Sequence, residues 1–337
     1  CENEVLGYTG KPDSYYNAII NWVKQRYDLI VTKEVINFVP GIVPGIGMAM
    51  NCFTQKGDKV MIQPPVYHPF AWVTTRNERT LVINPLRWEN GMYRMDLDAF
   101  REQIKGCKLF ILCNPHNPGG VVWTEAELRA IADICYDEKV LVFSDEIHAD
   151  LTLPPHTHRP FATVSEKARM NSVTFMSPSK AFNMPGLSAS HALIFNEDLR
   201  KRFRIYMDAG ELDMGHVFAF LSVEAAYSHG TEWLDQCLAY IQGNIDFVDE
   251  FLKKHAPKIK AIRPEASYLV WLDCRELELS QKDLNEFFVD KAHLALNDGE
   301  MFGKEGIGFM RLNVASPRCI IEKAMKQLAD AYQLYIK

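Results

Sequence analysis

The feature that most constrains the fold is a regular alternation of short β-rich runs with amphipathic helical segments between about residues 30 and 200. The expected strands are VINF, KVMIQ, TLVINP, KLFILCN, VLVFSD, SVTFM and HALIF. Between several of them apolar residues recur at helical spacing, as in 96–105 and 124–138. Thr124 followed by Glu127 predicts a capping box at the start of the second segment. The pattern favours an α/β fold with a mostly parallel sheet covered by helices.

The character of the sequence changes after about residue 212. Segments 214–229 and 231–255 are typical of helices, and the strand candidates SYLVWLD and FMRLNVA precede a closing helix at 317–335. We therefore predict a large domain over 1–229 and a smaller α+β C-terminal domain over 230–337. The first residues, CENEVLGYTG, read like the interior of a protein, so we expect an N-terminal segment to precede this numbering.

Composition excludes several classes of protein. The formal net charge of -6 argues against a nucleic-acid surface, because phosphate binding needs clustered Lys and Arg. No apolar stretch approaches a membrane span, and no signal peptide is visible. None of the eight cysteines has CxxC spacing, and several stand in apolar runs, so we predict reduced thiols and a cytoplasmic protein.

The segment SVTFMSPSKAFNMPGLS contains the most informative lysine. The expected strand ends at Met176, and Ser177, Ser179 and Lys180 follow directly. A surface lysine in a turn is the ordinary interpretation. Small hydroxyl residues around a lysine at the end of a buried strand nevertheless suit an amine that faces a phosphate-bearing ligand.

The segment VLVFSDEIHADL places Asp145 at the end of another apolar strand, with His148 three residues later. DEIH resembles the acidic box of a helicase, but that function needs an upstream GxxxxGK[ST] loop, which the sequence lacks. A metal site would need a further ligand group, and none has suitable spacing. The remaining interpretation is a buried carboxylate that pairs with a protonated ring nitrogen.

Two loops complete the pattern. NPHNPGG, 114–120, is either a tight turn or a ligand-facing loop, and its position before a capped helix favours the second. Gly41, Ile42, Val43 and Pro44 join a strand to a helix, where free backbone N–H groups attract phosphate. This second loop is no GxGxxG dinucleotide motif.

The ordered set NPHNPGG, SDEIH, SPSKAFN and GFMRLNVASPR resembles the fold-type I pyridoxal-phosphate enzymes of the class I/II aminotransferase superfamily. The resemblance extends over essentially the whole chain, and it is greatest to the cystathionine β-lyase and cystalysin-like branch, the MalY/PatB type. It implies an aminotransferase-like α/β fold and pyridoxal 5′-phosphate as the cofactor.

The resemblance also implies catalytic roles. Lys180 would carry the cofactor as a Schiff base and take the Cα proton of the substrate. Asp145 would keep the pyridine nitrogen protonated, which the electron sink requires. Asn117 and His148 would bind the 3-oxygen of the cofactor, and Tyr67 would stack on its ring. Histidine at position 148 is common in the lyase branch, whereas most aminotransferases have tyrosine there.

Further roles concern the phosphate and the substrate. The amides of Ile42 and Val43 and the hydroxyls of Ser177 and Ser179 would hold the phosphate. Many relatives have an arginine where this chain has Ser188. Arg311 would bind the substrate carboxylate in a bidentate pair, and Asn117 would also contact the substrate. Tyr8 matches a tyrosine that reaches the phosphate of the neighbouring subunit, which implies a homodimer.

The leading hypothesis is a carbon–sulfur β-lyase that cleaves L-cystathionine or related cysteine S-conjugates to pyruvate, ammonia and a thiol. An aminotransferase is the alternative, because both reactions share the steps up to the Cα carbanion. A regulatory binding protein is a third possibility, against which the intact set of Lys180, Asp145, Asn117 and Arg311 argues.

Some of these residues also have a purely structural interpretation. Arg311 could form an interdomain ion pair, and Tyr8 could be a core or interface aromatic residue. We interpret three histidines as surface or turn residues, namely His116, His156 and His158. We interpret three tryptophans as packing residues, namely Trp22, Trp233 and Trp271.

Overall fold

The computed structural model describes residues 7–335 and contains a seven-stranded sheet. Its strands are β1 (Ile36–Val39), β2 (Lys59–Ile62), β3 (Thr80–Ile83), β6 (Cys107–Cys113), β7 (Leu141–Asp145), β8 (Ser172–Met176) and β9 (Ser190–Leu193). The order is β1-β9-β8-β7-β6-β2-β3, and the sheet is parallel from β3 to β8, while β9 runs antiparallel to both of its neighbours. The seven expected strands and the mostly parallel sheet are confirmed.

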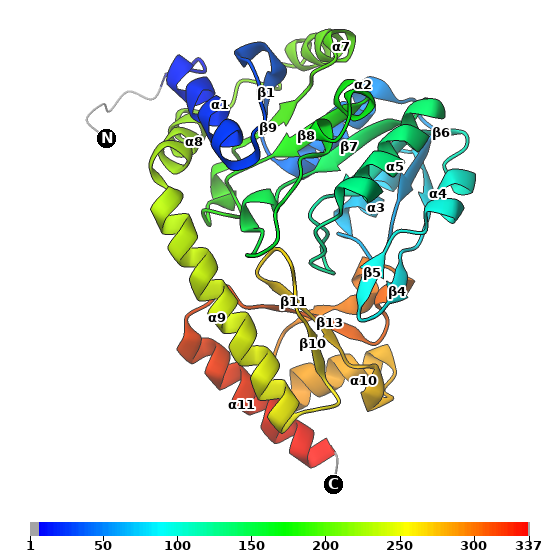
Figure 1. Ribbon diagram of the computed structural model, residues 1–337, viewed down its shortest axis with the longest axis vertical. Helices are drawn as coiled ribbons and strands as arrows, with labels where there is room; N and C mark the ends of the chain where they lie inside the picture. Colours follow the sequence, from blue (N-terminus) through cyan, green and yellow to red (C-terminus); the bar gives the residue numbers. More distant parts are fainter. Residues whose placement is uncertain (1–6, 336–337) are drawn as a thin grey trace.

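Helices cover both faces of this sheet (Figure 1). They are α1 (Asp13–Tyr27), α2 (Ile42–Phe53), α3 (Pro69–Arg76), α4 (Leu97–Gln103), α5 (Glu125–Asp137), α6 (Glu166–Met170), α7 (Glu197–Asp208) and α8 (Val217–His229). Side chains alternate along β6, so Phe110 packs with the core under α4 and α5 while Ile111 packs with the core under α2 and α7. The predicted capping box is present, because Thr124 and Glu127 each accept the other's backbone N–H.

The C-terminal part contains a second, antiparallel sheet. Its order is β10-β11-β13-β12, from β10 (Lys260–Ile262), β11 (Leu269–Asp273), β12 (Asn297–Asp298) and β13 (Phe309–Asn313). Helices α9 (Thr231–His255), α10 (Gln281–Glu286) and α11 (Arg318–Tyr335) accompany it. In Figure 1, α9 runs from the large sheet region down beside α11. This arrangement supports a boundary near residue 230, which we retain as a proposal.

A short hairpin was not predicted from the sequence. It consists of β4 (Arg87–Glu89) and β5 (Met92–Arg94), joined by Asn90 and Gly91, which both have positive φ. Its Tyr93 is buried and accepts a hydrogen bond from the indole N–H of Trp271 at 3.2 Å. The hairpin therefore packs the large part of the chain against β11. None of the helices in residues 7–335 is both long and apolar enough to cross a membrane.

Backbone hydrogen bonds join the two parts of the chain at the loop 114–120. The carbonyl of Gly120 accepts from the N–H groups of Glu265 and Ala266 at 2.8 and 3.1 Å. The Glu265 side chain accepts in turn from the N–H of Val122 at 2.8 Å. Gly120 has a φ of +67°, and a Cβ there would lie 2.5 Å from the Cβ of Pro264. Only glycine fits this contact.

Candidate active site

A cavity of about 360 Å³ lies at the carboxyl ends of β6, β7 and β8, where loops and the start of α2 meet the C-terminal sheet. Most of the residues expected from the sequence line this cavity: Ile42, Val43, Tyr67, Asn117, Asp145, His148, Ser179, Lys180 and Arg311. Residues distant in the sequence are thus assembled at one point of the fold.

Lys180 lies in the turn after β8, as expected, and it is partly buried. The turn is held by Ser177, whose hydroxyl lies 2.7 Å from the carbonyl oxygen of Ala189 and 2.8 Å from the Ser179 hydroxyl. The Ser179 N–H also donates to Ser177 at 3.1 Å. Ser177 is absent from the cavity lining, whereas Ser179 is part of it. Ser177 therefore stabilises the turn that carries Lys180.

Asp145 is the last residue of β7, and its carboxyl group is buried. Its Oδ1 accepts from the N–H of Ile147 at 3.1 Å, while burial raises the pKa of this carboxyl to about 7. No arginine or lysine within the described residues forms an ion pair with it. A positively charged group in the cavity would favour the ionised form and restore a normal pKa.

His148 follows β7 and is also buried. Burial, with Lys180 and Arg311 nearby, lowers the pKa of its imidazole to about 3, so the ring is neutral. Within residues 7–335 its Nδ1 has no hydrogen-bond partner. Because His148 lines the cavity, this ring atom is available to a group bound there.

Arg311 on β13 brings the C-terminal sheet to the cavity. It donates to Asn117 Oδ1 at 2.9 Å and to Asn297 Oδ1 at 2.7 Å, and its guanidinium lies 4.7 Å from the ring centroid of Phe302. Burial lowers the pKa of Arg311 to about 10, so it remains protonated at neutral pH. Its buried Nε has no partner in the described part of the chain. The expected ion-pair alternative is not seen, because both of its acceptors are neutral amides.

The N-terminus of α2 forms another wall of the cavity. Ile42 and Val43 are its first two residues, and Pro44 stands in its first turn as predicted. Backbone N–H groups at these positions have no acceptor within the helix. Gly41 precedes them at a φ of +150°, a conformation that favours glycine. The wall therefore offers N–H donors and the positive end of a helix dipole to an anion.

A buried pair lies behind Asp145 and corrects one expectation. Glu146 accepts from the Ser144 hydroxyl, from the Phe161 N–H and from His158 Nε2, each at 2.8 Å. His158 is buried, so its interpretation as a surface or turn residue is wrong. The hydrogen bond with Glu146 satisfies the Nε2 atom of the buried imidazole, which would otherwise need water.

Other expected residues fall outside the cavity. Tyr8 is 99% exposed and does not line the cavity in the single chain. His116 does lie in the 114–120 turn, but it is buried against Tyr93 and Trp123. Trp22 and Trp271 are packing residues as predicted, whereas Trp233 is 50% exposed and stacks on Phe182 with ring centroids 5.8 Å apart. Across residues 7–335 no group of three or more His, Cys, Asp or Glu side chains is arranged to hold a metal ion.

The sequence analysis missed part of the lining. Tyr268, Ser190 and Asn313 also face the cavity. Tyr268 precedes β11 and lies edge-on to His148 with ring centroids 6.4 Å apart. No motif surrounds Tyr268. The signal that could have identified it is its position just before β11, the strand that pairs with β13, which carries Arg311.

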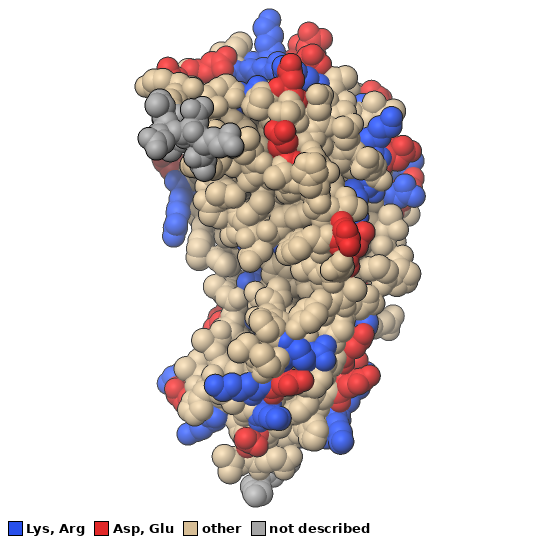
Figure 2. Space-filling model, turned by 90° about the vertical axis from the view of Figure 1, so that its left-hand side faces the viewer, with Lys and Arg blue, Asp and Glu red and all other residues tan. Residues whose placement is uncertain are grey.

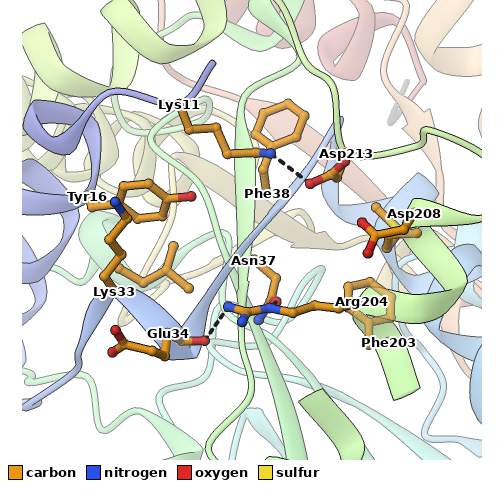
Figure 3. Close-up of a pocket in the computed structure, with 12 residues that line it drawn as sticks. Lys11, Tyr16, Lys33, Glu34, Asn37, Phe38, Phe203, Arg204, Asp208 and Asp213 are labelled. Atoms are coloured by element: carbon orange, nitrogen blue, oxygen red, sulfur yellow. Dashed lines mark hydrogen bonds and ion pairs between the residues drawn. The ribbon is translucent and has the colours of Figure 1, made fainter. Parts of the chain in front are cut away.

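A different cavity of about 360 Å³ lies between α1, β1 and α7 (Figure 3). Its basic side chains are engaged with neighbours. Lys11 pairs with Asp213 at 2.7 Å, and Arg204 donates to the carbonyl oxygen of Glu34 at 2.6 Å. Lys33 pairs with Asp13 at 2.6 Å. Lys180, the buried Asp145 and the carboxyl ends of the parallel strands all belong to the cavity described first. We therefore assign the chemistry to that cavity.

Most of the chain matches a known family. Residues 3–328 match the sequence profile of the aminotransferase class I and II family. The chain belongs to that family.

Individual relatives narrow the class. Cystathionine beta-lyase PatB of Bacillus subtilis is 37% identical over 98% of this chain and 86% of its own length. Protein MalY of Escherichia coli is 29% identical over 97% of this chain and 84% of its own length. The crystal structure of cystalysin from Treponema denticola, which contains pyridoxal 5′-phosphate, superposes with a TM-score of 0.96 at 34% identity, covering 100% of this chain and 86% of that one. A PLP-bound putative aminotransferase from Clostridium difficile also reaches a TM-score of 0.96, at 40% identity, over 98% of this chain and 86% of that one.

Proposed function

We propose that this protein is a pyridoxal-phosphate-dependent carbon–sulfur β-lyase that cleaves L-cystathionine or related cysteine S-conjugates. The observation that carries the proposal is the convergence of Lys180, Asp145, His148 and Arg311 on one cavity at the strand ends. Two relatives described as cystathionine β-lyases support the same reaction: PatB of Bacillus subtilis at 37% identity and a protein of Corynebacterium glutamicum at 29% identity.

The cavity fits the cofactor. Asp145 is a buried carboxyl group that forms no ion pair in the described chain, which suits a protonated pyridine nitrogen. His148 Nδ1 is a buried ring atom without a partner, which suits a hydrogen bond to the 3-oxygen. The first N–H groups of α2 and the Ser179 hydroxyl suit a phosphate.

The residues would divide the work of holding the cofactor. The amides of Ile42 and Val43 and the hydroxyl of Ser179 would bind the phosphate, and Tyr67 would cover one face of the ring. Ser177 would act through Ser179, because its own hydroxyl contacts the Ala189 carbonyl. Asn117 Oδ1 accepts a hydrogen bond from Arg311, which would leave the Nδ2–H donors of Asn117 for the 3-oxygen.

The remaining residues would act on the substrate. When bound, pyridoxal phosphate supplies a ring that accepts the electrons left at Cα. Arg311 would bind the α-carboxylate through its free Nε–H and hold Cα near Lys180. Lys180 would take the Cα proton. The Cβ–S bond would then break with its electron pair on sulfur, releasing a thiolate, and hydrolysis of the three-carbon product would give pyruvate and ammonia.

Transamination is the second candidate function. A similar structure from Clostridium difficile is described as a putative aminotransferase, and the residues discussed above serve both reactions up to removal of the Cα proton. The two reactions then differ in the fate of the substrate. In transamination the Cβ substituent stays and the amino group passes to a 2-oxo acid, whereas in elimination a good leaving group departs from Cβ.

Product analysis separates the two candidates. The purified protein is incubated with L-cystathionine in the absence of any 2-oxo acid, and pyruvate and free thiol are followed. We expect both to form in step. An absolute requirement for a 2-oxo acid acceptor, with amino transfer to it, would show an aminotransferase. Borohydride reduction followed by mass spectrometry should place the cofactor on Lys180. A protein that takes up no cofactor would favour the regulatory binding protein.

The active unit would be a homodimer, with Tyr8 reaching the phosphate of the neighbouring subunit. Figure 2 shows a middle band on the side of α8 and α9 where uncharged residues predominate between charged ends. Helix α8 contributes the exposed apolar side chains of Phe218 and Leu221, and Met214 precedes it. An exposed apolar surface of this kind suits a protein interface. Tyr8, 99% exposed in the single chain, is available to a second subunit.

We place the protein in the cytoplasm. The cysteines within the described residues are free thiols, and several are buried, including Cys107, Cys113 and Cys135. Burial raises the pKa of these thiols, which keeps them protonated and unreactive. Free cysteines in this number are typical of a reducing compartment. Cell fractionation with an antibody tests the location.

A further inference from the structure

A second cavity opens next to the catalytic one. It has a volume of about 300 Å³ and lies between the turn that carries Lys180, the start of α9 and the segment after β13. Three residues line both cavities, namely Lys180, Tyr268 and Asn313. The two spaces are therefore adjacent, and a substrate whose Cα lies near Lys180 has the second cavity within reach of its side chain.

The wall of the second cavity is aromatic and fixed in place. Trp233 stacks on Phe182, whose ring packs edge-on against the buried Trp22 at 5.7 Å. The hydroxyl of Tyr240 accepts the backbone N–H of Arg318 at 2.6 Å, which holds its ring beside Trp233 on α9. Both aromatic rings are nevertheless about half exposed. An exposed aromatic residue that is held rigidly contributes contact area to a ligand at little entropic cost.

The charge of the lining restricts the ligand. Lys180 is the only charged residue among those that line this cavity in the described chain. Its polar residues are neutral, namely Asn183, Asn313 and Ser316. The far end of cystathionine carries an ammonium and a carboxylate. The ammonium would lose water here without finding an anion, and the one cation, Lys180, is assigned to the cofactor and the Cα proton in the proposed function. A neutral apolar group has no charge whose hydration would be lost in this cavity.

We propose that this second cavity receives the leaving group of the substrate and favours neutral aryl or alkyl thioethers of cysteine over cystathionine. The inference rests on the proposed lyase function and names the substrate class of the same site. A cavity of roughly 150 Å³ already holds a benzene ring, so the space is sufficient for a benzylthio group. The departing thiol would leave through the face that Trp233 and Tyr240 border.

The test compares three substrates. Pyruvate release from S-methyl-L-cysteine, S-benzyl-L-cysteine and L-cystathionine gives kcat/KM for each with the full enzyme. We expect the benzyl substrate to exceed cystathionine by about tenfold or more. In Trp233→Ala, the ratio of kcat/KM for the benzyl substrate to that for the methyl substrate should fall about tenfold. Cys237→Phe, which fills the cavity from α9, should lower the same ratio.

A matched control and a binding measurement complete the test. Tyr136 on α5 is an aromatic residue exposed to a similar extent, 48%, but outside both cavities, so Tyr136→Ala should leave the ratio unchanged. Benzylthioacetate and methylthioacetate lack the amino group and cannot react, and calorimetry gives their dissociation constants. The tighter binding of the benzyl compound should disappear in Trp233→Ala and in Cys237→Phe.

The outcomes are distinct. Equal ratios in the wild type and both variants, by kinetics and by calorimetry, would overturn the assignment of the second cavity. A wild-type preference for cystathionine would also overturn it. No pyruvate from any of the three substrates would instead reject the lyase function, and the calorimetric ratio would still report on the cavity.

Discussion

The ionised Asp145 carboxylate should destabilise the cofactor-free protein and stabilise the protein with the cofactor bound. Burial raises the pKa of its carboxyl from 3.8 to about 7. A shift of one pKa unit corresponds to about 1.4 kcal/mol, so the ionised carboxylate costs the cofactor-free protein about 4 kcal/mol of stability above pH 7. Because the pKa of Asp145 is higher in the folded protein than in the unfolded chain, the protonated carboxyl group contributes its full stability below pH 3.8. That contribution is lost as the pH rises to about 7.

The variant Asp145→Asn removes the titration. In the cofactor-free protein, the free energy of unfolding of the variant minus that of the wild type should grow by about 3 kcal/mol between pH 5 and pH 8. Urea unfolding at the two pH values measures it. With pyridoxal phosphate bound, the protonated ring nitrogen becomes the missing partner, so the cofactor should stabilise the wild type more than the variant, and the variant should lose most of its lyase activity.

A control isolates burial as the cause. Asp98 has a side chain that is 99% exposed, and Asp98→Asn should shift stability by no more than a few tenths of a kcal/mol at either pH. Parallel pH dependences for the wild type and Asp145→Asn without the cofactor would refute the reasoning. So would equal stabilisation of the two proteins by the cofactor.

Four further outcomes are expected. Lys180→Ala should lose turnover and the borohydride-fixed lysine adduct; near wild-type pyruvate release would remove Lys180 from its role. Glu146→Ala leaves three buried donors unpaired and should cost about 3–5 kcal/mol in urea unfolding, whereas Glu146→Gln keeps one acceptor oxygen and should cost less. Tyr8→Phe should weaken cofactor binding by about 1 kcal/mol, and an unchanged dissociation constant would place Tyr8 elsewhere. Arg311→Lys loses the planar fork and should raise KM more than it lowers kcat, as steady-state kinetics would show.

The sequence predicted the large sheet well because each of its strands is a short apolar run bounded by turn residues. It also predicted most of the cavity, because Asp145 and Lys180 directly follow such runs. The β4–β5 hairpin was missed although Asn90-Gly91 is a strong turn signal, because its strands are only three residues long.

Other features depend on contacts that sequence spacing does not reveal. Glu146 and His158 are twelve residues apart on an irregular segment, so their pairing becomes visible only in the folded chain. Ser177 and Ser179 looked equivalent in the sequence. In the structure the Ser177 hydroxyl donates to the carbonyl group of Ala189, and of the two serines only Ser179 lines the cavity.

The hydrogen bonds between Gly120 and the 265–266 segment have a consequence for chimeric proteins. Asn117 stands three residues before Gly120, and the 265–266 segment leads directly into β11, which pairs with the strand of Arg311. The two residues that meet at 2.9 Å across the cavity are thus carried by backbones that are already joined. A C-terminal part transplanted from a relative would fit only with its own version of the 114–123 loop. When family members recombine, the 114–123 loop and the 265–266 segment are therefore expected to come from the same parent.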